Sequence, residues 1–227
     1  MRIRGKQWGT EVVILMLLGL TSVLAAKSDS SRTKTILVFG DSLSDGFMLP
    51  RTQAYPALLI SKLRAAGLDY EVINASQSGG TTEDGLHRLG PHLRKPVDIF
   101  LLELGINDAF QGVPVPEIEK NLQTLIDRVR AKNPDVRVVI SGMQLPDYST
   151  DDYVGRFGQM YVDLAEKNHA TLLPYLLFGV GGNPALNLPD HIHPNAAGQR
   201  VLAENVWKVL EPVAREVAGK RRSTNEE

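Results

Sequence analysis

Short apolar runs alternate along this chain with longer segments in which apolar residues recur every three or four positions. The short runs are rich in strand-forming residues and predict five strands, at residues 35–39, 70–73, 97–102, 136–140 and 171–173. The longer segments predict amphipathic helices, at residues 55–66, 83–93, 116–132, 151–164 and 202–213. Because the two kinds of element alternate, we expect an α/β fold in which helices cover both faces of a parallel sheet.

The first 26 residues follow a different pattern. Basic residues at positions 2, 4 and 6 precede an apolar run over residues 12–20, and small residues follow at Ala25 and Ala26. This arrangement is typical of a secretory signal peptide, and the apolar run is short for a membrane span. We therefore expect residues 1–26 to be a cleaved signal peptide and the protein to be periplasmic or secreted. An uncleaved N-terminal anchor is the alternative.

The rest of the chain is expected to form one domain, because it contains no internal repeat and no second regime of composition. The expected boundaries are a flexible lead-in at 27–34, the domain at 35–216 and a polar tail at 217–227.

Charge and cysteine content narrow the possible partners. The formal net charge is -1, which gives no electrostatic reason to expect a nucleic-acid partner. Cysteine is absent from the sequence, which excludes disulfides and a lipid-modified cysteine. We expect a monomer that acts on a small molecule and has no stable membrane span after processing.

The first predicted strand runs into Gly40-Asp41-Ser42-Leu43, and Gly46 closes the turn. Ser42 is thereby placed at the carboxyl end of a strand, the edge where ligands bind in open α/β sheets. A serine in such a turn is by itself more often a helix cap or turn hydroxyl than a catalytic group.

Three later polar stretches are expected at the same edge of the sheet. They are Asn74–Thr82, which follows the second strand, Glu103–Asp108, which follows the third, and Asp190–Asn195, which precedes the last helix. Because the carboxyl ends of parallel strands meet at one edge, these stretches converge on Ser42.

Together with Gly40-Asp41-Ser42-Leu43, these stretches resemble in order and residue type the four signature blocks of the GDSL or SGNH hydrolases. The resemblance spans residues 35 to about 213 and is strongest to the bacterial arylesterase and multifunctional thioesterase/lysophospholipase branch. Right-handed crossovers leave few strand orders. The resemblance implies one of them, a flavodoxin-like three-layer sandwich with five parallel strands in the order 2-1-3-4-5.

A nucleophilic serine needs a positioned base, and His191 and His193 are the candidates among five histidines. The spacing Asp190-x-x-His193 lets a carboxylate hold one ring nitrogen while the other faces Ser42. The resemblance implies that His193 is the base and Asp190 its orienting partner. His191 stands where the family often has glycine, and a shared or replacing role for it stays open.

The resemblance also implies three donors for the oxyanion: the backbone N–H groups of Ser42 and Gly79 and the side-chain amide of Asn107. Gly80 departs from the pattern, because relatives commonly carry an acidic residue there.

The loops expected to wall the acyl site are mostly apolar. Their candidate substrate-binding residues are Phe110, Leu145, Leu177, Phe178, Val180 and Leu186. Such a wall favours acyl chains and aryl groups. We expect a serine esterase for aryl and short-to-medium acyl esters, extending to thioesters or lysophospholipids. A carbohydrate acetyl esterase and a non-catalytic flavodoxin-like binding protein are the alternatives.

Metal and cofactor chemistry have little support in the sequence. Asp190, His191 and His193 form only a partial ligand set, and no second cluster with ligand spacing completes it. No phosphate-cradling motif occurs either, since no G-x-G-x-x-G is present and no Lys-Ser/Thr pair follows Gly46. No cofactor and no metal are expected.

Overall fold

The protein is described by a computed structural model that covers residues 32–146 and 152–223. The expected signal peptide and residues 27–31 of the expected lead-in lie outside the described residues. The unit that begins at Thr33 contains all five predicted strands and the predicted helices between them.

Five parallel strands form the centre of this unit. Their bounds are β1 Lys34–Gly40, β2 Tyr70–Asn74, β3 Ile99–Glu103, β4 Arg137–Ser141 and β5 Thr171–Leu173. They pair in the order β2-β1-β3-β4-β5, and every pair is parallel. The α/β fold class and the predicted strand order are therefore confirmed.

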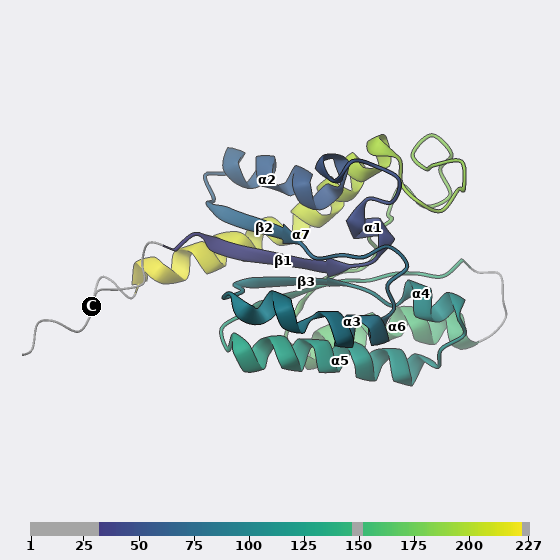
Figure 1. Cartoon of the computed structure of the whole chain (residues 1–227), viewed down its shortest axis with the longest axis horizontal. Coiled ribbons are helices and arrows are strands. Elements are labelled where there is room, and N and C mark those ends of the chain that lie inside the picture. Colours follow the sequence, from purple (N-terminus) through teal and green to yellow (C-terminus); the bar gives the residue numbers. More distant parts are fainter. Residues whose placement is uncertain (1–31, 147–151, 224–227) are drawn as a thin grey trace, which may run out of the picture. The chain divides into compact units, whose positions relative to one another are not determined.

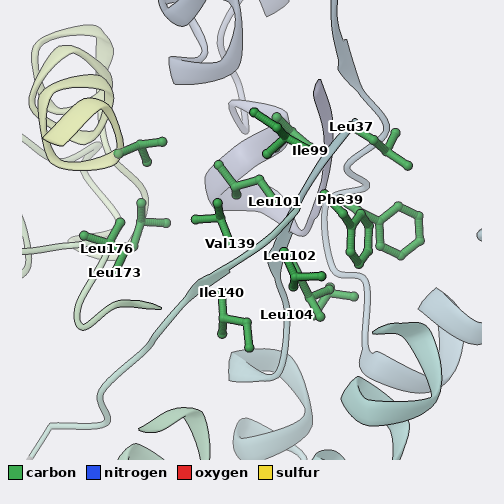
Figure 2. Packing of buried hydrophobic residues seen from close by; sticks show 14 of the residues in the cluster. Leu37, Phe39, Ile99, Leu101, Leu102, Leu104, Val139, Ile140, Leu173 and Leu176 are labelled. Atoms are coloured by element: carbon green, nitrogen blue, oxygen red, sulfur yellow. The ribbon is translucent and has the colours of Figure 1, made fainter. Parts of the chain in front are cut away.

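Helices cover both faces of the sheet (Figure 1). On one face lie α2 (Tyr55–Ala65) and α7 (Ala196–Ser223), which pack against each other. On the other lie α3 (Thr82–Arg88), α5 (Val115–Lys132) and α6 (Asp152–Lys167). Because β1 and β3 are covered from both sides, all of their residues are buried, and their apolar side chains fill the core seen in Figure 2.

Short helical turns at the carboxyl edge were not expected from the sequence. Two α-helical turns, α1 (Ser42–Asp45) and α4 (Ile106–Phe110), directly follow β1 and β3. A 3-10 turn, η1, spans Arg51–Gln53. These segments are too short to show a hydrophobic period, which is why the sequence pattern could not reveal them.

The helix predicted at 83–93 is divided. α3 ends at Arg88, and a 3-10 segment, η2, occupies Gly90–Arg94. Pro91 has no N–H and restricts the residue before it, so a continuous α-helix through this point is disfavoured.

Helix α7 continues seven residues beyond the expected domain end at 216, to Ser223. Its inner face still packs there, because Val217 and Ala218 lie against the core. The ammonium group of Lys34 also donates a hydrogen bond to the Val217 carbonyl. The first part of the expected polar tail is therefore helical. Within residues 32–146 and 152–223, none of the helices has the length and apolar character needed to cross a membrane.

Candidate active site

The four polar stretches meet at the carboxyl edge of the sheet. Ser42 is the first residue of α1, directly after β1, and Asn107 lies in α4, just after β3. Gly79 follows β2, and His193 precedes α7. Ser42 and Asn107 are therefore carried by helical turns, whereas Gly79 and His193 lie in the segments that connect strands and helices.

Ser42, His193 and Asp190 form a continuous line of hydrogen bonds. The Ser42 Oγ lies 3.0 Å from Nε2 of His193, and Nδ1 of the same ring lies 2.7 Å from Oδ2 of Asp190. Ser42 is 8% exposed, whereas the side chains of His193 and Asp190 are 20% and 35% exposed, so this line of groups opens to solvent. The three residues predicted as nucleophile, base and orienting acid are thus brought together.

The turn around Asp190 orients its carboxylate. Although burial raises its pKa, hydrogen bonds from the backbone N–H groups of His193 and Ile192, and from the His193 ring, lower the pKa of Asp190 to about 2. Asp190 is therefore ionised at any pH at which the protein would work, and it favours the imidazole tautomer with its proton on Nδ1.

His191 has a different place. Its φ of 59° lies in the left-handed region, which glycine adopts most readily. Its side chain lines the cavity described below, and the ring that bonds Ser42 is that of His193.

Two of the three expected oxyanion donors, Ser42 and Asn107, line the cavity described below, and Gly79 lies in the turn after β2. The N–H of Ser42 is the first of α1 and has no partner within the helix. Gly79 has a φ of 77°, a conformation that glycine adopts without strain. The Nδ2 atom of Asn107 donates to the Gly80 carbonyl at 3.0 Å and to Oδ2 of Asp41 at 3.3 Å.

An ion pair that sequence reasoning missed ties the Gly79 loop to the helix of Ser42. Asp45 in α1 accepts a hydrogen bond from the Ser78 hydroxyl at 2.8 Å and one from Arg51 at 2.6 Å, and Arg51 also donates to the Ser76 carbonyl. Burial raises the pKa of Asp45, but these bonds from Ser78 and Arg51 outweigh it and lower that pKa. One indication of this ion pair is present in the sequence, the acidic residue Asp45 in the turn after Ser42.

A cavity of about 760 Å³ opens beside Ser42. Its lining is largely apolar. The residues that line it are Ser42, Leu43, Ile106, Asn107, Phe110, Met143, Gln144, Leu145, Pro146, Tyr175, Leu177, Gly181, Gly182, His191, Ile192 and His193. This volume suits a small organic substrate.

Of the six residues expected to bind substrate, three line this cavity: Phe110, Leu145 and Leu177. The structure does not place the other three there. Phe178 is 68% exposed and borders a neighbouring depression, Val180 is completely buried in the core, and Leu186 packs against the core. The apolar residues of the loop at 175–188 therefore have two roles. Leu177 lines the cavity, whereas Val180 and Leu186 pack against the core and hold the loop in place.

Within the described parts of the chain, no group of three or more His, Cys, Asp and Glu side chains is arranged to hold a metal ion. The carboxylate of Asp190 and the ring of His193 are bonded to each other rather than spread around an open site.

Comparisons with known proteins identify the family of the chain. The model of the GDSL-like Lipase/Acylhydrolase family matches residues 38–201. The chain is 36% identical to Esterase TesA of Pseudomonas aeruginosa over 200 residues, which is 87% of this chain and 98% of the relative. It is 32% identical to Thioesterase 1/protease 1/lysophospholipase L1 of Escherichia coli strain K12 over 208 residues, or 91% and 94% of the two chains.

A crystal structure of TesA matches with a TM-score of 0.75 and 37% identity, covering 79% of this chain and 99% of that one. The strand order and the family match lead to one conclusion. The chain belongs to the GDSL-like lipase/acylhydrolase family, and it is a serine ester hydrolase.

Proposed function

We propose that this enzyme hydrolyses carboxylic esters through an acyl-enzyme formed on Ser42. The observation that carries this proposal is the line of hydrogen bonds from Ser42 Oγ through the His193 ring to the Asp190 carboxylate. In this arrangement Nε2 of His193 is the acceptor for the hydroxyl proton, and Asp190 stabilises the imidazolium that forms.

The reaction proceeds in two halves. The Ser42 oxygen attacks the ester carbonyl while its proton passes to Nε2 of His193, and the tetrahedral intermediate collapses when that proton is returned to the leaving alcohol. A water molecule then attacks the acyl-enzyme, with His193 again taking and returning a proton. The products are a carboxylic acid, an alcohol and free Ser42.

The charge on the carbonyl oxygen would be held by the N–H groups of Ser42 and Gly79 and by the Asn107 amide. Both hydrogens of that amide already point at protein acceptors, the Gly80 carbonyl and Asp41. Binding the oxyanion therefore requires Asn107 to exchange one of these bonds. The bond to the neutral Gly80 carbonyl is the one we expect it to exchange, because the Asp41 carboxylate is the stronger acceptor when it is ionised.

The preferred substrates are aryl esters and short-to-medium acyl esters, with thioesters and lysophospholipids as further substrates. Support comes from the apolar lining that Phe110, Leu145 and Leu177 give to the cavity. The names of two relatives point the same way: an arylesterase of Vibrio mimicus, 34% identical over 87% of this chain and 98% of that one, and the thioesterase/lysophospholipase of Escherichia coli.

Labelling with a fluorophosphonate probe tests the acyl-enzyme proposal, because the probe reacts with activated serines. We expect stoichiometric labelling of Ser42, found by peptide mapping, together with loss of esterase activity. Absence of labelling in a folded protein would favour the non-catalytic binding protein. Strong activity on acetylated xylan combined with little on aryl esters would favour the carbohydrate acetyl esterase.

We further propose that the protein is exported and acts as a monomer. The basic, apolar and small residues of positions 2–26 support export. N-terminal sequencing of exported protein should begin near Ala26, whereas an intact N-terminus in the membrane fraction would indicate an anchor. Sedimentation velocity of the processed protein gives the oligomeric state.

A further inference from the structure

Two carboxyl groups, those of Asp41 and Glu103, are buried together directly behind the Ser42 turn. Both residues are 0% exposed, and the register of β1 and β3 sets Gly40 beside Glu103. A Cβ atom on Gly40 would lie 2.5 Å from Oε2 of Glu103 and 2.6 Å from the Ser44 hydroxyl. The glycine before Asp41 therefore leaves room for the Glu103 carboxyl group.

Within the described residues, one of the two carboxyl oxygens of Glu103 is hydrogen-bonded and the other is not. Oε2 accepts from the Ser44 hydroxyl at 2.6 Å and from the Asp41 N–H at 3.2 Å. Oε1 is buried and accepts no hydrogen bond from any residue in the described ranges. A buried carboxylate with an unpaired oxygen is strongly unfavourable because it is charged, and protonation removes that charge, so these surroundings favour the neutral acid.

Asp41 has the opposite surroundings. Its Oδ1 accepts from the Leu43 N–H at 2.9 Å, and its Oδ2 accepts from the Asn107 amide at 3.3 Å. Both oxygens are acceptors, which suits an ionised carboxylate.

The charged and titratable groups that face the pair come from four helices. Arg88 of α3 is the cation, Asp108 of α4 adds negative charge, and the phenols of Tyr55 in α2 and Tyr161 in α6 complete the surroundings. Arg88 lies close enough to donate to the Gly40 carbonyl at 2.7 Å. One cation facing two carboxyl groups favours a pair with a single negative charge.

The pKa values follow this arrangement. Burial raises the pKa of Asp41 to about 7, against the lowering effects of the Leu43 N–H, Glu103 and Arg88. Burial, and then the neighbouring charge of Asp41, raise the pKa of Glu103 well above its ordinary value. Asp41 is therefore the first of the two to lose its proton.

We propose that Asp41 and Glu103 hold one proton between them in the active enzyme, kept on Glu103, and that the charge left on Asp41 positions the Asn107 amide. This proposal rests on the proposed function, in which that amide is an oxyanion donor. Asp41 and Glu103 are positioning residues, because they act through Asn107 and the Ser42 turn and do not touch the reacting atoms.

Protonation can be measured on the unmodified enzyme. Carbon-13 NMR of the carboxyl carbons of labelled Asp and Glu is followed from pH 5 to pH 9. We expect the Asp41 signal to titrate near pH 7 and the Glu103 signal to keep its protonated position while Asp41 titrates. A Glu103 carboxylate that is ionised at pH 7 would overturn the proposal.

Matched variants then test positioning. Glu103→Gln keeps a neutral donor of the same shape, so kcat should stay within about 3-fold. Asp41→Asn removes the charge facing Asn107, so kcat should fall about 100-fold, as when an oxyanion donor is lost, with KM little changed. Asp108→Asn, which alters a buried carboxyl bonded to Thr82, is the control and should keep kcat within a few-fold.

The double variant Asp41→Asn/Asn107→Ala separates positioning from general damage. If Asp41 acts through Asn107, the double variant should be no slower than Asn107→Ala alone. If the kcat losses of Asp41→Asn and Asn107→Ala multiply in the double variant, the positioning role is rejected. An equal loss of kcat in Glu103→Gln and Asp41→Asn would also reject it. If Asp41→Asn does not fold, the NMR titration decides.

The same variants distinguish an error in the oxyanion role of Asn107 from an error in the positioning role of Asp41. If Asn107→Ala keeps full kcat while the fluorophosphonate probe still labels Ser42, the oxyanion role of Asn107 is wrong, and the positioning role falls with it. If Asn107→Ala is slow but the two losses multiply, only the positioning role is wrong.

Discussion

The phenyl ring of Phe47 lies against the imidazole of His193, with ring centroids 4.3 Å apart and planes inclined by 34°. Phe47 follows the Ser42 turn, and its N–H donates to the Ser42 carbonyl. The segment that carries the Ser42 hydroxyl therefore also carries the phenyl ring of Phe47, and contact with that ring restricts the orientation of the His193 imidazole.

Replacing this ring should weaken catalysis moderately. An aromatic pair is worth about 0.5–1.5 kcal/mol, so Phe47→Leu should lower kcat/KM by about 2- to 12-fold on a p-nitrophenyl ester. Met48→Leu is the matched control, because Met48 is the next residue and its side chain is 79% exposed. Equal effects of the two variants would show that the stacking has no role in holding His193.

Ser42→Ala should abolish ester hydrolysis while leaving the fold intact, because among the described residues the Ser42 hydroxyl bonds the His193 ring alone. Ser44→Ala should retain turnover but unfold more easily. The Ser44 hydroxyl bonds Tyr55 and Glu103 in the interior, and breaking such contacts costs about 1–3 kcal/mol. Thermal unfolding and initial rates measure both. Surviving turnover in Ser42→Ala would reject the nucleophile assignment.

His193→Ala and His191→Gly distinguish the roles of the two histidines. We expect kcat to fall by roughly 10³-fold or more in His193→Ala, the scale of losing a triad member. His191→Gly should stay close to the wild type, since glycine readily adopts the φ of 59° found there. The reverse order of losses would move the base to His191.

Chain-length dependence tests the apolar cavity. Each methylene buried against Leu145 and Leu177 is worth about 0.8 kcal/mol, or roughly four-fold in kcat/KM, until the cavity is filled. We therefore expect p-nitrophenyl esters to improve from acetate toward medium acyl chains. Leu177→Ser should flatten this series, and Phe178→Ser, at the neighbouring depression, should not. A sharp preference for acetyl would contradict this assignment.

The stability of the enzyme should depend on pH through Glu103. Its pKa is raised in the folded state, so its contribution is fully present below the unfolded pKa of about 4.5 and is lost as pH rises through the folded value. Glu103→Gln removes this dependence. The drop in Tm from pH 5 to pH 8 should therefore be smaller in the variant. An unchanged or larger drop would mean that Glu103 is ionised in the native protein.

The pattern of the sequence was enough to predict the five strands and the edge of the sheet that carries the candidate site. Strand and helix periods place β1 to β5 within two residues of their predicted bounds, because a central parallel strand must be apolar on both faces. Gly40-Asp41-Ser42-Leu43 falls at the end of β1 for the same reason. The roles of Ser42, Asp190 and His193 stay predictions that the measurements above can test.

Tertiary structure alone decided which apolar loop residues meet the cavity. Leu177 lines it, while Val180, three residues later and equally apolar, is completely buried in the core. Composition does not distinguish the two, because both positions favour apolar side chains and no regular period orients a loop. The pairing of Asp41 with Glu103 was equally hidden, since 62 residues separate them in sequence and only the β1–β3 register brings them together.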